Sequence, residues 1–236
     1  MVGSVFSPYY AWARRRGEAD PLNHCGLNVA LYGRRGKRWS LTERGRAALE
    51  RSSSYLTIGP SALCWDRDAL TIEIEEVTAP VPTRLQGRIR LYPQALVDYQ
   101  APLDAAVRHR WSPIAPCARV EVEMTRPSIR WAGSAYFDSN AGDEPLESAF
   151  RGWDWSRAPH RGGTSVLYHV DSQEGAGANL AVHGTIGLEN EPWLLRPPGY
   201  PAFIAVPLLV AGPPRVITDA YLERAAPVLY LSLIHI

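Results

Sequence analysis

Two short segments carry the residues best suited to chemistry. In His109-Arg-Trp111 and in Tyr136-Phe-Asp138, the outer residues are two positions apart. If both segments are extended, each outer pair projects from one face of its strand, because side chains alternate along a strand. If the two faces meet, an acid, an imidazole, a phenol and an indole surround one volume. The set contains no activated serine or cysteine, no phosphate loop and no metal-ligand triad, and it suits proton transfer to an apolar substrate.

Protonation of an alkene is a reaction in which each of these groups has a use. Burial keeps a carboxylic acid protonated at neutral pH, because desolvation disfavours the anion, and Asp138 would be that acid. The faces of Trp111 and Tyr136 would stabilise the resulting carbocation, at on the order of 2 kcal/mol for each desolvated cation–π contact. Histidine exchanges protons near neutral pH, so His109 could place the final water and accept its proton.

Each motif also has an ordinary structural interpretation. A Tyr-x-Asp followed by Ser139 and Asn140 is, in most β proteins, a strand end that runs into an Asx turn. A His-x-Trp pair most often only packs, and Asp154 would face away from the two tryptophans that flank it on a strand. The remaining histidines lack ligand spacing, so no metal site is predicted. From spacing alone, the structural interpretation is favoured over the acid.

The elements that must position these residues are expected to be β-strands. The 236 residues include 20 Pro and 19 Gly against 2 Met and 4 Phe, which indicates many short elements joined by turns. Alternation of apolar and polar residues predicts half-buried strands over 69–75 and 119–124. Further strands are expected over 85–92, 128–137, 164–171, 179–189 and 202–210. This spacing suits antiparallel sheets or barrels.

One helix and one linker are expected between the strands. Ser40-Leu-Thr-Glu43 matches a capping box, which predicts a helix over 44–51. The first ten residues read as a strand already in progress. The proline-rich stretch 93–116 breaks the strand rhythm, so we expect a linker there and a division of the chain near residue 105.

Composition and charge exclude several classes of partner. The formal net charge of +1 and the pI near 7.8 provide no field for capturing a polyanion, so nucleic acid is not an expected partner. The three cysteines are an odd number without Cys-x-x-Cys spacing, which argues for a reducing compartment rather than a disulfide framework or a zinc ribbon. The longest apolar run, over 201–212, contains Pro207 and is shorter than the roughly 20 residues that span a bilayer.

Longer motifs, rich in Trp, Tyr and Asp, extend over nearly the whole chain. By these motifs the chain resembles the carotenoid 1,2-hydratases, also called hydroxyneurosporene synthases. The motifs are Gly3-Ser-Val-Phe-Ser-Pro-Tyr-Tyr-Ala-Trp12, Leu22-Asn-His-Cys25, Trp39-Ser-Leu-Thr-Glu43, His109-Arg-Trp111, Trp131-Ala-Gly-Ser-Ala-Tyr-Phe-Asp-Ser-Asn140, Gly142-Asp-Glu-Pro-Leu-Glu147 and Gly152-Trp-Asp-Trp-Ser156.

The resemblance implies a cofactor-independent hydro-lyase of phototrophic bacteria. Such an enzyme adds water across the terminal C1–C2 double bond of acyclic carotenes, for example neurosporene or lycopene, and yields the tertiary 1-hydroxy carotenoid. The family's functional positions correspond to His109, Trp111, Tyr136 and Asp138, with Asp138 as the proton donor. Because carotenes reside in membranes, we expect a cytoplasmic enzyme that touches the inner, photosynthetic membrane peripherally through an exposed apolar rim near its cavity.

The resemblance also implies two lipocalin-like, calycin-type antiparallel β domains. We expect the first over 1–105, without its early strands, and the second over 106–230. Residues 231–236 match the translation of a transposase sequencing adapter and are expected to be artefactual, so the chain is interpreted as a fragment cut at both ends.

Two other functions remain open at this stage. The same architecture could hold an apolar carotenoid or terpenoid without reacting with it, or it could host a related cofactor-free terpenoid cyclase or isomerase, because a fold does not determine a function. A carrier has no need of a buried acid that faces aromatic side chains, so the surroundings of Asp138 distinguish these alternatives.

Overall fold

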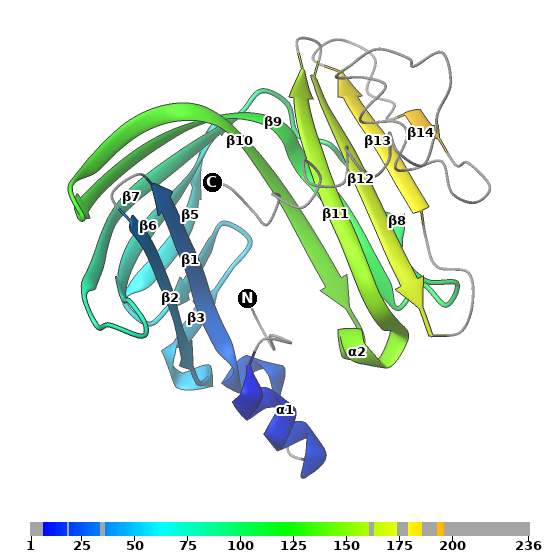
Figure 1. The fold of residues 1–236 in the computed structure, drawn as a ribbon, viewed down its shortest axis with the longest axis horizontal. Coiled ribbons are helices and arrows are strands. Elements are labelled where there is room, and N and C mark those ends of the chain that lie inside the picture. Colours follow the sequence, from blue (N-terminus) through cyan, green and yellow to red (C-terminus); the bar gives the residue numbers. More distant parts are fainter. Residues whose placement is uncertain are drawn as a thin grey trace. The chain divides into compact units, whose positions relative to one another are not determined.

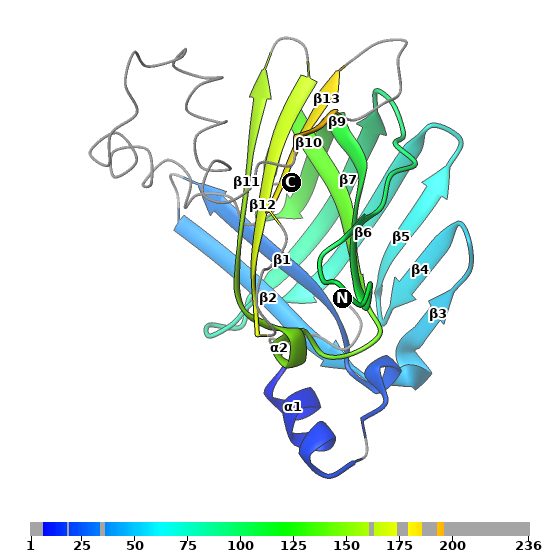
Figure 2. The ribbon, with the colours of Figure 1, turned by 90° about the vertical axis from the view of Figure 1, so that its right-hand side faces the viewer.

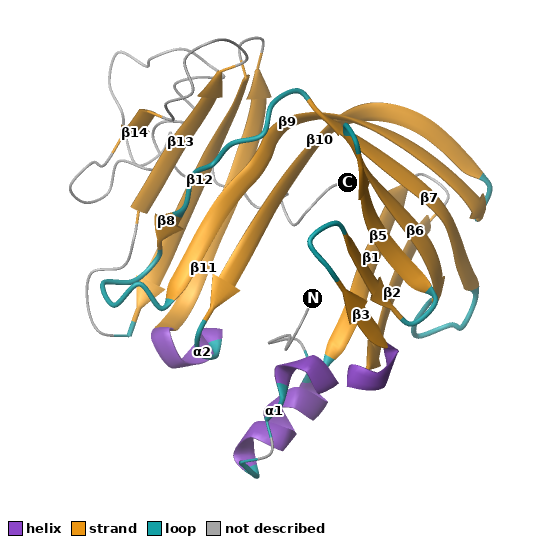
Figure 3. Ribbon diagram, turned by 180° about the vertical axis from the view of Figure 1, so that it is seen from behind, coloured by secondary structure: helices purple, strands orange, loops and turns teal. Residues whose placement is uncertain are grey.

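The computed structural model describes residues 7–17, 19–33, 36–160, 163–173, 179–185 and 193–195. This part of the chain is mainly β, as expected, and Figure 3 shows how few of its elements are helices. Residue contacts divide it into two units, one from Met1–Tyr92 with Arg119–Gly133 and the other from Pro93–Ala118 with Ser134–Ile236. No helix in these ranges has the length and apolar character needed to cross a bilayer.

Unit 1 begins with helix α1 (Pro8–Arg15), which leads through the turn η1 (Pro21–Asn23) into a hairpin (Figure 1). The Ser7 hydroxyl accepts a hydrogen bond from the Tyr10 N–H at 2.9 Å, and Pro8 stands at the first helical position. Both features start helices, because they satisfy or remove amide donors that the first turn leaves unpaired. The expected strand at the start of the chain is therefore wrong from Pro8 onward.

The hairpin consists of β1 (Cys25–Gly33) and β2 (Gly36–Arg44), and it overturns the helix predicted over 44–51. Ser40 lies inside β2 opposite Val29, and Glu43 binds the ring of His24 rather than a backbone amide. The chain continues as a short turn, η2 (Arg46–Ala48), and a strand, β3 (Leu49–Arg51). Every residue of β2 pairs with a residue of β1, and this tertiary pairing outweighs a local capping pattern.

A meander of antiparallel strands completes unit 1. Its strands lie in the order β3, β4, β5, β6, β7, β9 and β10, and β9 and β10 continue into unit 2. The strands predicted over 69–75, 85–92, 119–124 and 128–137 are confirmed, although each is longer than expected. The strands of the meander after β3 are β4 (Tyr55–Ile58), β5 (Ser61–Asp66), β6 (Ala69–Val77), β7 (Arg84–Pro93), β9 (His109–Arg126) and β10 (Ile129–Gly142).

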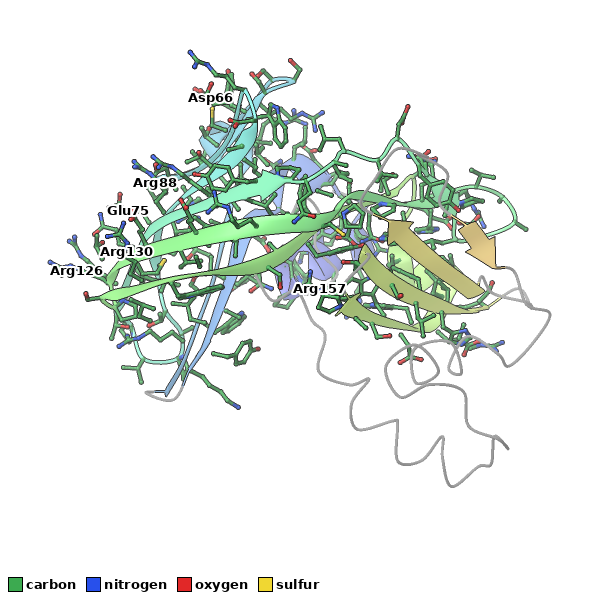
Figure 4. The ribbon with its side chains drawn as sticks, turned by 90° about the horizontal axis from the view of Figure 1, so that it is seen from above. Asp66, Glu75, Arg88, Arg126, Arg130 and Arg157 are labelled. Carbon is green, nitrogen blue, oxygen red and sulfur yellow. The ribbon has the colours of Figure 1, made fainter. Side chains whose placement is uncertain are left out.

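The two faces of this meander differ as the alternation predicts. Leu70, Ile72 and Ile74 are buried on the inner face. On the outer face Glu73 pairs with Arg88 across neighbouring strands, and Figure 4 shows Arg88 among the charged side chains that extend from the sheet. Cross-strand ion pairs of this kind suit a solvated face, so unit 1 has one apolar and one charged surface of its sheet.

Unit 2 contains the parts of β9 and β10 that carry the predicted site. A second sheet lies in the order β11, β12, β13, β14, and its first three strands run side by side in Figures 1 and 2. The strand predicted over 164–171 is confirmed by β12, and that over 179–189 by β13 as far as Thr185. The rest of the latter, the strand over 202–210 and residues 231–236 lie outside the described residues. The bounds are β8 (Ala101–Pro102), α2 (Leu146–Ala149), β11 (Phe150–His160), β12 (Gly163–Ser172), β13 (Asn179–Thr185) and β14 (Trp193–Leu195).

The linker predicted over 93–116 is wrong at β8 (Ala101–Pro102) and again from His109 onward, where β9 begins and contains Pro113 and Pro116. Prolines are tolerated here because neighbouring amides donate to other carbonyls of β9. The Val97 N–H donates to Ile114 O and the Gln94 N–H to Cys117 O, both at 2.9 Å, so neither contact needs an N–H from a proline. The domains predicted over 1–105 and 106–230 remain a prediction.

Candidate active site

The core of unit 2 is an aromatic cluster built from four strands. Trp111 comes from β9, Tyr136 from β10, Trp155 from β11 and Tyr168 from β12. Trp155 and Tyr168 are register partners, so they share one face of their sheet. The ring centroids of Trp111 and Tyr168 are 5.5 Å apart, and those of Tyr136 and Trp155 are 5.1 Å apart, both in tilted arrangements that aromatic pairs favour.

Asp138 places its carboxyl group at the edge of this cluster. Its Oδ2 accepts hydrogen bonds from Trp111 Nε1 at 2.8 Å and from the Tyr136 hydroxyl at 3.2 Å. Three of the four residues predicted from spacing are therefore brought together. Because both donors use Oδ2, the remaining oxygen, Oδ1, is the one that can carry the proton of the neutral acid.

The surroundings favour the protonated form of this acid. Burial raises the pKa of Asp138, and the hydrogen bonds from Trp111 and Tyr136 together with the charge of Arg157 oppose that rise only in part. Burial also raises the pKa of Tyr136, and the nearby Asp138 carboxylate adds to this rise. Tyr136 is thus a neutral phenol that donates its proton to Asp138 in a hydrogen bond.

Trp111 and Tyr136 contact the acid through the edges of their rings. Trp111 is fully buried, at 0% exposure, and its indole N–H is directed at Asp138. The guanidinium carbon of Arg157 lies 5.5 Å from the centroid of the Tyr136 ring, as a cation–π contact. One face of Tyr136 therefore already holds a cation. Stabilisation of a carbocation by these two ring faces stays a prediction.

His109 lies in a different set of hydrogen bonds from Asp138. Its Nδ1 is 2.9 Å from Asp104 Oδ2, and its Nε2 is 3.2 Å from the backbone oxygen of Glu144. Both neighbours are acceptors, so both ring nitrogens are placed to donate. The ring also packs edge-on against Phe150, with centroids 4.7 Å apart. The structure does not bring His109 into a hydrogen bond with Asp138.

Asp104 and Gly142 complete the surroundings of His109. Although burial raises the pKa of Asp104, hydrogen bonds from the Arg108 amide and from His109 hold that pKa below its usual value. A Cβ at Gly142 would lie 2.9 Å from Cδ2 of His109, so only glycine leaves room for the ring. The imidazole therefore ties the start of β9 to the end of β10.

Sequence reasoning missed Asp104, Trp155, Arg157 and Tyr168. For two of them a usable signal was present: Trp155 and Arg157 continue the i, i+2 spacing that begins at Trp153. Tyr168 falls within a predicted strand, but only the β11–β12 register shows that it faces Trp155. Asp104 precedes His109 in a loop, where no periodicity indicates a partner.

Residues from three of the amino-terminal motifs, Tyr10, His24 and Glu43, contact one another in unit 1. The rings of Tyr10 and His24 lie 5.0 Å apart, and His24 Nδ1 is 2.6 Å from Glu43 Oε1. These contacts tie α1 and the segment before β1 to β2. Within the ranges that the structure describes, no group of three or more His, Cys, Asp or Glu side chains could hold a metal ion.

A protonatable carboxyl group held by two aromatic donors at the edge of an aromatic cluster is suited to general-acid chemistry on an apolar substrate. The chain belongs to the carotenoid hydratase CrtC family, whose model matches residues 1–191. This finding confirms the resemblance drawn from the motifs.

Curated relatives agree with the family assignment. The chain is 60% identical over 182 residues to the acyclic carotenoid 1,2-hydratase of Thiocapsa roseopersicina, covering 77% of this chain and 45% of that protein. It is 55% identical over 173 residues to the acyclic carotenoid 1,2-hydratase of Rubrivivax gelatinosus, covering 72% of this chain and 43% of that protein. It is 40% identical over 199 residues to the acyclic carotenoid 1,2-hydratase of Cereibacter sphaeroides, covering 84% of this chain and 69% of that protein. The chain thus spans less than half the length of the first two relatives. No solved structure matches it.

Proposed function

We propose that this protein is a hydro-lyase that adds water to the terminal C1–C2 double bond of an acyclic carotene, such as neurosporene or lycopene, to give the 1-hydroxy carotenoid. The observation that carries the proposal is Asp138, a carboxyl group with a raised pKa, two donors on Oδ2 and aromatic side chains around it. Family membership and the name shared by the curated relatives support the choice of substrate.

The proposed reaction begins with proton transfer from Asp138 Oδ1 to C2. The π electrons of the double bond form the new C–H bond, and the positive charge remains on C1, which carries two methyl groups and is the better stabilised carbon. The oxygen of water then forms a bond to C1. The resulting oxonium returns a proton to the Asp138 carboxylate, so the acid is regenerated and the net change is the addition of one water. No cofactor takes part.

In this mechanism the other predicted residues support the acid. Trp111 and Tyr136 donate to the carboxylate that forms when the proton leaves, which lowers the cost of that charge in a buried place. The aromatic faces of the cluster stabilise the carbocation. His109 acts as a positioning residue, because it fixes the start of β9 two residues before Trp111 through Asp104 and the Glu144 carbonyl.

We further propose that the chain contains two lipocalin-like domains, over 1–105 and 106–230. The antiparallel order of the β3–β7 meander supports this assignment, and the resemblance to the carotenoid 1,2-hydratases suggested it. The proposed location is the cytoplasm, with peripheral contact to the photosynthetic membrane.

The proposed function is tested by incubating the purified protein with lycopene or neurosporene in oxygen-18 water. We expect a hydroxylated product that carries the label at its new hydroxyl group. Tight binding with no product would support the alternative of a carrier. An isomer of unchanged mass would support a cyclase or isomerase, and a hydroxylated product without the label would contradict hydration.

Membrane contact is supported by one face of α1. Tyr9 and Trp12 are 68% and 53% exposed, and the exposed Arg15 and Arg16 lie on the same side of the helix. The Arg16 guanidinium lies 4.0 Å from the centroid of the Trp12 ring. Tryptophan and tyrosine favour the bilayer interface, and arginines are attracted to anionic lipid, so this face suits the surface of an anionic membrane.

We expect the protein to bind phosphatidylglycerol vesicles more tightly than phosphatidylcholine vesicles in a flotation assay. Replacing both Arg15 and Arg16 by Gln should weaken binding to the anionic vesicles roughly 30-fold, at about 1 kcal/mol for each arginine near the surface. The matched control replaces the exposed Arg51 and Arg126 of unit 1 by Gln and changes the net charge equally. An equal loss in both double variants would contradict docking through α1.

A further inference from the structure

Trp155 carries a buried hydrogen-bond donor that the described part of the chain leaves without a well-formed hydrogen bond. Its indole nitrogen is shielded from solvent and forms no hydrogen bond of normal geometry with the residues described, although the Trp155 N–H lies close enough to the Tyr136 hydroxyl to oppose the rise in the pKa of Tyr136. Two other tryptophans have acceptors: Trp111 donates to Asp138, and Trp39 donates to Asn28 at 2.8 Å. Buried N–H groups without a partner are rare in folded proteins, and they are retained where a ligand or a water accepts the bond.

The position of Trp155 relates this donor to the acid. Its ring packs against Tyr136 with centroids 5.1 Å apart, and the Tyr136 hydroxyl donates to Asp138. Arg157, two residues along the same face of β11, offers only donors. The group that satisfies the Trp155 N–H must be an acceptor, and an oxygen atom next to the acid meets this requirement.

We propose that the Trp155 N–H binds the water molecule that captures the carbocation. This inference rests on the proposed hydration of the terminal double bond. One lone pair of the water oxygen accepts the hydrogen bond from Trp155, and the other forms the bond to C1. A proton of that water passes to the Asp138 carboxylate, because an indole N–H is a donor only and cannot accept it. Trp155 is thus a water-binding residue, and Asp138 performs both proton transfers.

The proposal has a consequence that a structural role for Trp155 does not share. The carbocation has two fates: capture by water, which gives the alcohol, or return of a proton to Asp138, which restores an alkene. In heavy water the acid carries deuterium, so each return leaves some deuterium in the recovered carotene. Loss of the bound water should shift the carbocation from capture to return.

The test compares Trp155→Phe with the unsubstituted protein in heavy water. Phenylalanine keeps an aromatic ring and removes the N–H. We expect the hydration rate to fall roughly tenfold, as for loss of one hydrogen bond, while the deuterium in recovered carotene per alcohol formed rises by a similar factor. Trp153→Phe on the same strand is the control, because Trp153 is 43% exposed, and it should change neither quantity. The readouts are mass spectra of the alcohol and of the recovered carotene.

Each other outcome is informative. If Trp155→Phe lowers hydration and deuterium exchange together, Trp155 supports the acid and the proposal is overturned. Trp155→His, which restores a ring N–H, should recover part of the lost hydration, and equal behaviour of the Phe and His variants would also contradict the proposal. If the unsubstituted protein forms neither alcohol nor deuterated carotene, the proposed function itself fails, before any variant is compared.

Discussion

Asp138→Asn should reduce hydration by on the order of 10⁴-fold, the upper range for loss of a general acid. The amide oxygen can still accept the hydrogen bonds from Trp111 and Tyr136, so the geometry around it is retained. The amide nitrogen would take the place of Oδ1 and cannot supply the acid proton. The measurement is the rate of alcohol formation in oxygen-18 water. Retained hydration would refute Asp138 as the proton donor.

The same substitution should not destabilise the protein at neutral or alkaline pH. Burial raises the pKa of Asp138 in the folded state, so folding favours the protonated carboxyl group. This contribution to stability is complete below the ordinary carboxyl pKa and is lost as the pH rises through the raised pKa. Asparagine does not titrate, so Tm of the variant relative to the unsubstituted protein should increase with pH over that window. A variant that melts lower at every pH would show that its lost activity reflects damage to the fold.

Trp111→Phe and Tyr136→Phe should each lower hydration roughly 10- to 100-fold, since a hydrogen bond to a charged group contributes about 1.5–3 kcal/mol. Each substitution removes a donor that stabilises the Asp138 carboxylate, so the pKa of Asp138 rises further and its acid becomes weaker. The protonated form then persists to higher pH. In a profile of rate against pH, the plateau should fall while the loss of activity on the alkaline side moves to higher pH.

Matched controls for these variants come from unit 1. Tyr92 donates its hydroxyl to the carboxylate of Glu121 at 3.1 Å, and Trp39 donates its N–H to Asn28. Tyr92→Phe and Trp39→Phe therefore remove the same kinds of hydrogen bond away from Asp138, and the pH profile should not move.

Because Trp111 and Tyr136 share Oδ2 of Asp138, the Trp111→Phe, Tyr136→Phe double variant should lose less hydration activity than the sum of the two single effects, expressed as free energies. Full additivity would argue against a shared acceptor.

Local patterns predicted much of the fold and part of the candidate site. The strand β6 and the later part of β9 follow from alternation, since that signal is contained in neighbouring residues. The same periodicity placed Trp111 on one face of its strand, and Tyr136 with Asp138 on one face of another. Three local signals failed. The proline-rich stretch 93–116 contains β8 and the start of β9 where a linker was expected. The capping box at Ser40 yielded to pairing with β1, and the Ser7-Pro8 pair began a helix where a strand was expected.

The sequence by itself determined a mainly β protein of the carotenoid hydratase family and the residue types around the acid. Only the tertiary structure decided that Trp111 and Tyr136 share Oδ2 of Asp138, and that His109 binds Asp104 and the Glu144 carbonyl instead. It also decided that the Trp155 N–H forms no hydrogen bond of normal geometry with the described residues. The physical reason is that hydrogen-bond partners, burial and the resulting pKa depend on which distant strands pack together, and no periodicity within one segment records that choice.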